Sequence, residues 1–293
     1  LAAGSPVGIR EADLAASTQV VLEQAVLAIA ERAARTTGER FACLAGGVAL
    51  NCVANGRLLA EGPFEDLWIQ PAAGDDGGAL GAALWTAHQI LDRPRAPAGV
   101  GGDRMRGAFL GPTFDGDEVA AWLAENRVDH DRPSDLAGAV ADRLAAGELV
   151  GWCAGAMEFG PRALGHRSIL ADPRDPAVAA RLNQAIKGRE GFRPFAPAVL
   201  AEQASEWFEL DRPSPYMLRT AAVHPRRRLD VDEASVDEED FAGRLALVRS
   251  TIPACTHVDG SARVQTVDRD QNPVLHELLV AFCDRTGCPV LLN

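Results

Sequence analysis

The stretch 40-RFACLAGGVALNCVANGRLLAEG-62 decides the fold class. Its short apolar run ends at Gly46-Gly47, and the apolar residues that follow recur at positions compatible with one face of a helix. The next stretch, 66-DLWIQPAAGDDGGALGAALWTAHQIL-91, repeats this plan of strand, turn and helix. Its helix is rich in glycine and alanine, so we expect it to pack closely against a neighbour. Strands that alternate with helices predict an α/β layer architecture.

The flanking sequence adds further elements on both sides. Helical spacing of apolar residues predicts a helix from Ser17 to Arg35, ended by Gly38, and further helices near 119–123 and 136–146. The run 149-LVGWCAG-155 predicts a strand. Asn272-Pro273 is a typical helix start and Gly287 a typical end, so RVQTV before this helix and CPVLLN after it complete a strand–helix–strand unit.

The domain boundary is expected in 92-DRPRAPAGVGGDRMRG-107, which is rich in proline and glycine and has no apolar period. A chain of 293 residues with 47% hydrophobic composition favours two domains. We place them at 1–110 and 111–293. The first residue is not methionine and the last follows a predicted strand directly, so we expect a chain truncated at both ends.

Composition narrows the functional classes. A net charge of −12 and a pI near 5.0 disfavour broad binding to nucleic acid or an anionic membrane. The sequence has no run of about 18 apolar residues and no basic-then-apolar leader, which predicts a cytoplasmic protein without membrane contact. The six cysteines form no C-x-x-C pair, and we expect free, small, buried thiols.

Lys187 is the only lysine of the chain, whose other 28 basic residues are arginines. The window 157–194 holds seven basic and four acidic residues, a net +3 within an acidic chain. A lysine ammonium can follow a developing anion, whereas an arginine fork grips oxygens in pairs, so the two are not interchangeable at a catalytic position. The glycines and prolines of 187-KGREGFRPFAP-197 favour an anion site here. A lysine that survived on a solvated face is the alternative.

Arg162 and Arg167 lie in 158-EFGPRALGHRSILADPR-174, where Pro161 can open a helix. Free N–H groups at the start of such a helix would point at an anion beside the two arginines. Surface arginines paired with carboxylates are the alternative reading.

Two turns of the first domain are weaker candidates. Gly46-Gly47 suits close approach to a ribose or phosphate but equally describes a plain tight turn. Asp75 and Asp76 precede a helix, where capping is the commonest role of aspartate and a metal or catalytic role the alternative. No two histidines stand four residues apart to form a helical metal pair.

Several blocks together resemble the carbamoyltransferases of antibiotic and nodulation-factor biosynthesis. The matching stretches are GGVALNCVANGRL (46–58), PAAGDDGGALGAAL (71–84), EFGPRALGHRSILADPR (158–174), NQAIKGREGFRPFAPAVL (183–200), SPYML (214–218) and THVDGSARVQTV (256–267). CPVLLN resembles the start of the family's longer L-L-N-T-S-F-N motif.

The resemblance implies the C-terminal part of an ASKHA domain (the actin and sugar-kinase superfamily), followed by an α/β domain similar to those that form threonylcarbamoyl-adenylate. In such enzymes the second domain makes carbamoyl-adenylate from carbamoyl phosphate and ATP, and the first transfers the carbamoyl group to a hydroxyl-bearing small-molecule acceptor.

Carried onto this sequence, the resemblance implies catalytic roles for Lys187, Arg189 and Arg193. It implies substrate or ATP contacts at Arg162, Arg167, Gly46 and Gly47. Asp76 matches a ligand of a divalent metal, iron or magnesium/manganese, whose two histidine ligands are expected outside this chain. His257, Asp259 and Arg263 share one motif in which ligand contact and a buried polar network both remain open, and Asn293 is a candidate adenylate contact.

Two other functions remain open. A transferase acting on a protein or tRNA is disfavoured by the acidic chain, and a non-catalytic nucleotide-binding scaffold is disfavoured by Lys187 and its cationic window. The acceptor, the metal and the oligomeric state, with a homodimer among the candidates, are not readable from the sequence.

Overall fold

The computed structural model describes residues 7–95, 103–232, 236–237 and 240–293. Its first part, residues 7–95, holds three α-helices and two strands. These elements are α1 (Ile9–Thr37), β1 (Phe41–Leu44), the 3-10 helix η1 (Gly47–Leu50), α2 (Cys52–Glu61), β2 (Asp66–Ile69), α3 (Asp76–Trp85) and the π-helical turn η2 (Thr86–Ile90). Strands β1 and β2 pair in parallel, which confirms the two predicted strand–turn–helix units.

The second part contains three small sheets and further helices. Its helical elements are η3 (Arg106–Ala108), α4 (Gly116–Glu125), α5 (Leu136–Ala145), α6 (Val178–Arg181), η4 (Leu182–Lys187), η5 (Ala201–Gln203), α7 (Ala204–Trp207), η6 (Pro225–Arg227), α8 (Phe241–Ala246), η8 (Pro253–Cys255) and α9 (Pro273–Thr286). Its strands are β3 (Val150–Cys153), β4 (Arg167–Leu170), β5 (Pro197–Leu200), β6 (Thr220–Ala222), β7 (Ser261–Arg263), β8 (Gln265–Val267) and β9 (Val290–Leu292).

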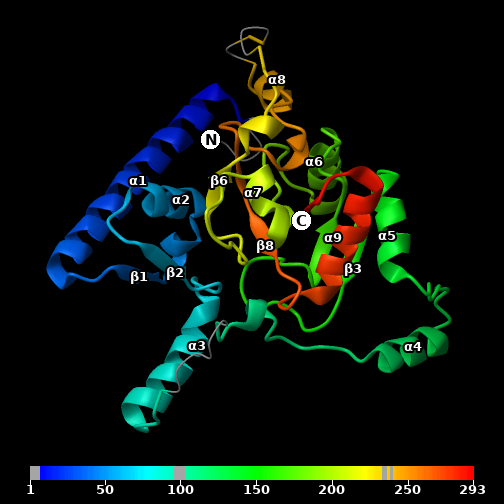
Figure 1. The fold of residues 1–293 in the computed structure, drawn as a ribbon, viewed down its shortest axis with the longest axis horizontal. Helices are drawn as coiled ribbons and strands as arrows, with labels where there is room; N and C mark the ends of the chain where they lie inside the picture. The colour runs from blue at the N-terminus through cyan, green and yellow to red at the C-terminus, as the bar shows by residue number, and fades with distance from the viewer. Residues whose placement is uncertain (1–6, 96–102, 233–235, 238–239) are drawn as a thin grey trace.

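The predicted strand–helix–strand unit at the C-terminus forms the centre of the second part. Asn272 caps α9 by accepting the Leu275 N–H, and Gly287 ends the helix in the left-handed region. Strand β8 runs parallel to β5 and β9 runs antiparallel to it, so the three strands form one sheet with β5 in the middle. Helix α9 packs against α5, and Figure 1 shows the two helices side by side.

The observed fold is therefore a mixed α/β structure built from small sheets. The largest core cluster joins α5 and α9 to the central sheet, with Leu275, Leu279 and Phe282 fully buried. A second cluster lies at the boundary between the two parts: Tyr216, Met217 and Leu218 pack there with Ile69 and Leu50 of the first part. This boundary positions the candidate site.

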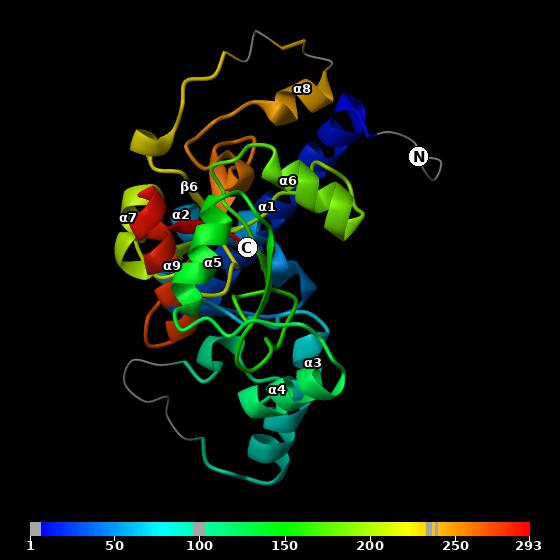
Figure 2. The same ribbon diagram turned by 90° about the vertical axis from the view of Figure 1, so that its right-hand side faces the viewer.

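Three sequence-based expectations need correction. Helix α3 has no buried residue, and nothing within the described residues approaches Gly78 or Gly81, so the predicted close packing is absent there; Figures 1 and 2 both show α3 projecting from the body. Residues 158–166 form a loop rather than a helix opened by Pro161. The six cysteines were expected to be buried thiols, but only Cys255 and Cys288 are buried, whereas Cys52 and Cys283 are partly exposed and Cys43 and Cys153 are exposed.

The linker prediction is answered in part, because residues 96–102 lie outside the described residues. Residues 103–108 are packed into the boundary cluster, where Met105, Gly107 and Ala108 are buried. The Tyr216 hydroxyl donates to Asp103 at 2.5 Å and accepts from the Gly107 N–H at 3.2 Å. This end of the predicted linker is fixed.

Helix α1 is long and apolar. Within the described ranges it is the one helix long and apolar enough to cross a bilayer, a test that core helices of soluble proteins also pass. It is tied to α2 by the amide pair Gln19–Asn51 and the ion pair Glu23–Arg57. The absence of membrane contact stays a prediction.

Candidate functional site

Two turns of the first part meet at the carboxyl ends of β1 and β2. The Gly46 N–H donates to the Ala73 carbonyl at 2.7 Å, which joins the glycine turn to the turn that leads to Asp75 and Asp76. Gly46 has a φ of 98°, a conformation that favours glycine, and both Gly46 and Gly47 are exposed with open space around them. The carboxyl ends of parallel strands are a common place for ligands in α/β folds.

Asp75 and Asp76 are exposed, and the Asp75 side chain does not cap α3. Capping, the commoner role for these aspartates, is therefore not what the structure shows. Within the described residues no group of three or more histidine, cysteine or carboxylate side chains is arranged to hold a metal. Asp76 as a metal ligand stays a prediction that needs donors from elsewhere.

In the second part, Arg162, Arg189 and Arg263 form a cationic group that we call the arginine cluster. The three side chains come from the 158–166 loop, the loop after η4 and strand β7. Burial and the positive charges of Arg162 and Arg189 lower the pKa of Arg263 to about 10. Burial also lowers the pKa of Arg162 and of Arg189.

The arginine cluster has no carboxylate partner in the part of the chain that the structure describes. The Nε atoms of Arg162 and Arg263 are buried without a hydrogen-bond partner, and so is the Oδ1 atom of Asn293. The charge of Glu190 offsets part of the positive charge at Arg189. No ion pair neutralises Arg162 or Arg263 among the described residues, so an anion would relieve the repulsion between these like charges. This geometry is unlike that of surface arginines paired with carboxylates, the alternative for Arg162.

Asn293 contacts the loop that carries Arg162. Its Nδ2 atom donates to the Ala163 carbonyl at 3.3 Å and to Gln265 at 3.0 Å. Gln265 in turn donates to the Leu164 carbonyl at 2.7 Å. Asn293, which directly follows strand β9, therefore helps to hold the 158–166 loop in place.

Lys187 and Arg193 lie on the same loop as Arg189, but both are exposed. Lys187 is the last residue of η4, and Gly188 follows it in the left-handed region with a φ of 55°. Arg193 forms an ion pair with Glu190 at 2.8 Å. The Lys187 ammonium makes no hydrogen bond or ion pair within the described ranges. Lys187 is thus two residues before Arg189 in sequence. No hydrogen bond or ion pair within the described ranges fixes its side chain.

Arg167 has a different role from the one expected. Its Nη1 atom donates to the carbonyls of Ala154, Gly155 and His166 at 2.9–3.2 Å. This side chain therefore fastens the end of β3 to the start of β4. The sequence resemblance assigned it to substrate or ATP, and in the structure its Nη1 donor is occupied by the protein itself.

Sequence reasoning did not identify Glu158 as the organiser of this loop. Its Oε1 atom accepts from the backbone N–H groups of Leu164, His166 and Arg167 at 2.7, 2.9 and 3.2 Å. In place of the expected helix start with N–H groups free for an anion, the chain after Pro161 is a loop whose N–H groups bind an internal carboxylate. The signal was an acidic residue standing at the start of a basic window.

His257 and Asp259 shape the turn before β7. His257 accepts or donates a hydrogen bond with the Ser261 hydroxyl at 3.1 Å, and Asp259 accepts the Ser261 N–H at 2.9 Å. Burial lowers the pKa of His257, and the charge of Arg263 acts in the same direction. The contacts are those of a local polar network that supports the strand carrying Arg263.

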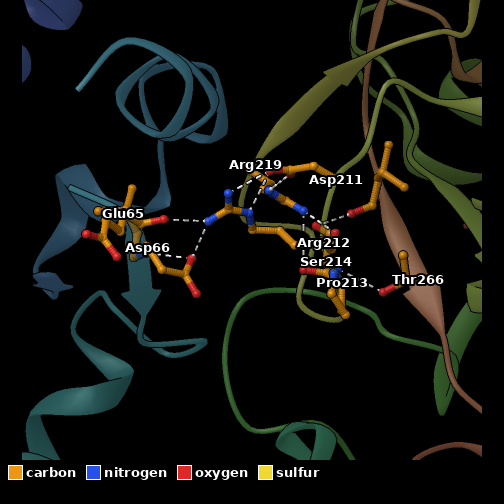
Figure 3. Close-up of polar contacts among 10 residues, drawn as sticks. Glu65, Asp66, Asp211, Arg212, Pro213, Ser214, Arg219 and Thr266 are labelled. Atoms are coloured by element: carbon orange, nitrogen blue, oxygen red, sulfur yellow. Dashed lines mark hydrogen bonds and ion pairs between the residues drawn. The ribbon is translucent and has the colours of Figure 1, made fainter. Parts of the chain in front are cut away.

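Arg212 joins the two parts of the chain. Arg212 reaches from the second part to the Glu65 carbonyl at 2.9 Å and to Asp66 at 3.0 Å, and it pairs with Asp211 at 2.6 Å, as Figure 3 shows. The Arg212 guanidinium lowers the pKa of Asp211. A cavity of 230 Å³ lies beside these ion pairs, lined mainly by apolar side chains that include Trp68, Tyr216 and Leu218.

Comparison with known proteins gives two family-model matches and several relatives. Residues 4–84 match the family model described as Carbamoyltransferase N-terminus, and residues 141–293 match Carbamoyltransferase C-terminus. An uncharacterized protein of Synechocystis sp. is 50% identical over 99% of this chain and 47% of its own length. Nodulation protein NolO of Bradyrhizobium diazoefficiens is 42% identical over 99% of this chain and 49% of its own length.

A 3'-hydroxymethylcephem-O-carbamoyltransferase of Amycolatopsis lactamdurans is 35% identical over 85% of this chain and 41% of its own length. The chain thus spans about half the length, or less, of these curated relatives. The match to the C-terminal family model covers more than half of the residues, and it includes the whole arginine cluster. The chain belongs to the carbamoyltransferase family.

Proposed function

We propose that this protein takes part in ATP-dependent transfer of a carbamoyl group to a hydroxyl of a small molecule. The observation that carries the proposal is the arginine cluster, in which the charges of Arg162 and Arg189 act on Arg263, no ion pair is formed within the described residues, and two Nε donors are buried without a partner. A relative whose name states O-carbamoyl transfer to a hydroxymethyl cephem supports the same reaction class.

The proposed reaction in the second part forms carbamoyl-adenylate. Water first hydrolyses carbamoyl phosphate to carbamate and phosphate, and carbamate then attacks the α-phosphorus of ATP through a carboxylate oxygen. The new P–O bond forms as the bond to the pyrophosphate oxygen breaks, so pyrophosphate leaves. The arginine cluster would neutralise the anionic reactants and hold them in line, which is the main contribution a protein makes to phosphoryl-type transfer.

Lys187 fits a separate task in this scheme. Its exposed ammonium is not committed to another residue within the described ranges, so it can move with charge that develops on the phosphate oxygens. Arg193 is partly neutralised by Glu190 and would act in the outer part of the site.

The first part is proposed to carry the transfer step. In this proposal it is the C-terminal portion of an ASKHA domain, with Gly46 and Gly47 against a nucleotide and Asp76 on a divalent metal. The second part would be an adenylate-forming domain similar to the threonylcarbamoyl-adenylate enzymes, with the boundary near residue 110. Asp76, with its neighbour Asp75, would hold the metal together with ligands from outside the described residues, which bring no third histidine, cysteine or carboxylate to these aspartates. A cytoplasmic location completes the proposal.

The experiment that tests the function is carbamoyl-phosphate-dependent ATP–pyrophosphate exchange, measured on the wild-type protein and on Lys187→Arg and Lys187→Ala. The proposal predicts exchange that requires carbamoyl phosphate and falls by about 100-fold or more in both variants. Exchange that persists in both removes Lys187 from the mechanism. ATP binding by calorimetry without any exchange would favour a nucleotide-binding scaffold.

A further inference from the structure

Asn183 lies at the base of the loop that carries Lys187, Arg189 and Arg193, and it has no exposed surface. Its Nδ2 atom donates to the carbonyls of Gly191 at 3.2 Å and Arg193 at 2.9 Å. Its Oδ1 atom accepts from Arg189 Nε at 2.7 Å. Its backbone carbonyl accepts the N–H groups of Gly188 and Arg189. One buried side chain therefore ties both ends of the loop together.

The hydrogen bonds at position 183 favour asparagine over aspartate and alanine. The site needs two donors aimed at carbonyl oxygens and one acceptor aimed at a guanidinium, and a primary amide supplies that combination on a short side chain. Aspartate would keep the acceptor but place an oxygen against two carbonyls. Alanine would leave two carbonyls and a guanidinium nitrogen without their partners, and unmade hydrogen bonds of buried groups are costly.

The bond from Asn183 fixes the direction of Arg189. Because Nε is bound to Oδ1, the two terminal nitrogens of Arg189 remain available, and neither makes a hydrogen bond to the described residues. The guanidinium carbon of Arg189 lies 4.9 Å from the centroid of the Phe195 ring, and this contact favours the observed orientation of the guanidinium plane. The charge of this guanidinium acts on Arg263, as the charge of Arg162 does, which makes Arg189 a member of the arginine cluster.

We propose that Asn183 is a positioning residue, which aims Arg189 at the anionic substrate of the arginine cluster through its Oδ1–Nε bond while its amide group holds the loop closed. The inference rests on the proposed function, since it assigns the substrate anion to that cluster. It adds a residue that touches no substrate. Pre-organising a charged group in this way contributes to rate because the group need not reorient during the reaction.

A double-mutant cycle separates positioning from a merely structural role. Carbamoyl-phosphate-dependent ATP–pyrophosphate exchange is measured for the wild type, Asn183→Ala, Arg189→Ala and the double variant. If Asn183 acts through Arg189, Asn183→Ala lowers kcat/KM for carbamoyl phosphate by about 10- to 100-fold in the wild-type background, and by less than about two-fold once Arg189 is alanine. Effects of the two variants that multiply would overturn the inference.

Asn272→Ala is the matched control, because Asn272 is also buried and caps α9 without contacting the 188–193 loop. Its effect should multiply with that of Arg189→Ala. If Asn183→Ala does not fold at the assay temperature, the cycle is run with the isosteric Asn183→Asp, for which independence from Arg189 again overturns the inference. If exchange is absent in the wild type, or is unchanged by Arg263→Ala, the proposed function is contradicted and the inference with it. If exchange depends on Arg263 but the cycle shows no coupling between Asn183 and Arg189, the inference alone is contradicted.

Discussion

Arg162 of the second part donates through Nη2 to the backbone carbonyl of Leu50 in the first part at 3.1 Å. Leu50 is the last residue of η1, which begins at Gly47, so one turn of 3-10 helix separates the glycine turn from a member of the arginine cluster. The two proposed sites are therefore in direct structural contact. Gly56 of α2 packs against the backbone of Thr220 at the same boundary.

The packing of α2 against β6 predicts that a glycine-to-alanine substitution in α2 changes protein stability in the opposite direction from usual. In a helix interior Gly→Ala ordinarily stabilises by about 0.5–1 kcal/mol. At Gly56 the added carbon would lie 2.9 Å from the Thr220 carbonyl oxygen, so we expect Gly56→Ala to destabilise the protein. Gly81→Ala in α3, where nothing lies within 4 Å, should stabilise it. Urea unfolding of both variants checks the prediction, which fails if the two shift stability in the same direction.

The contacts of Glu158 predict that this carboxylate supports the 158–166 loop. Glu158→Ala removes the acceptor of three backbone N–H groups and should cost about 1–3 kcal/mol of unfolding free energy. Glu158→Gln keeps one acceptor oxygen and should cost less. Glu125→Ala on the exposed face of α4 is the control, expected within about 0.5 kcal/mol of wild type. Equal stability of Glu158→Ala and the control would refute the assignment.

The lowered pKa of His257 predicts that the stability of the folded protein changes with pH in a defined direction. Burial lowers its pKa in the folded state, so below the unfolded pKa of about 6.5 the unfolded chain binds more protons than the folded one. Stability should therefore fall as the pH drops from about 6.5 toward the folded pKa. In His257→Gln this part of the dependence should disappear. Denaturant unfolding between pH 7 and 5 makes the comparison, and identical slopes in the two proteins would contradict it.

Tyr216 is the only tyrosine of the chain, so tyrosinate absorbance reports on it alone. Burial, followed by the hydrogen bond to Asp103, raises its pKa. The neutral phenol is favoured by the fold, and stability is lost as the pH rises above the unfolded pKa of about 10. We expect the absorbance to rise only together with alkaline unfolding. A titration near pH 10 in the folded protein would show that the bond to Asp103 is not formed.

Local patterns predicted most of the elements correctly, since capping residues and apolar spacing act over a few positions. Asn272 and Gly287 bound α9, and Gly38 ends α1 in the left-handed region, as their residue types indicate. The loop at 158–166 could not be predicted in this way. Its course depends on Glu158 binding three N–H groups and on Gln265 and Asn293, which are distant in sequence.

In the candidate site, too, some features follow from local sequence and others depend on long-range contacts. Residue type and the local excess of positive charge identified Arg162, Arg189 and Lys187, and the family resemblance added Arg263. That Arg162, Arg189 and Arg263 converge while Arg167 turns to carbonyls is a consequence of tertiary packing, which no spacing in the sequence encodes. The role of Asn183 depends on three contacts within its own loop and becomes visible only with coordinates.

The most direct test of the account is carbamoyl-phosphate-dependent ATP–pyrophosphate exchange in Arg263→Ala, measured beside Arg226→Ala. Arg263 is the member of the arginine cluster that both other members perturb, whereas Arg226 is exposed on η6. We predict that Arg263→Ala lowers kcat/KM by about 100-fold or more while Arg226→Ala stays within about two-fold of wild type. Exchange that is equal in the two variants would contradict the central claim that the arginine cluster binds the reacting anion.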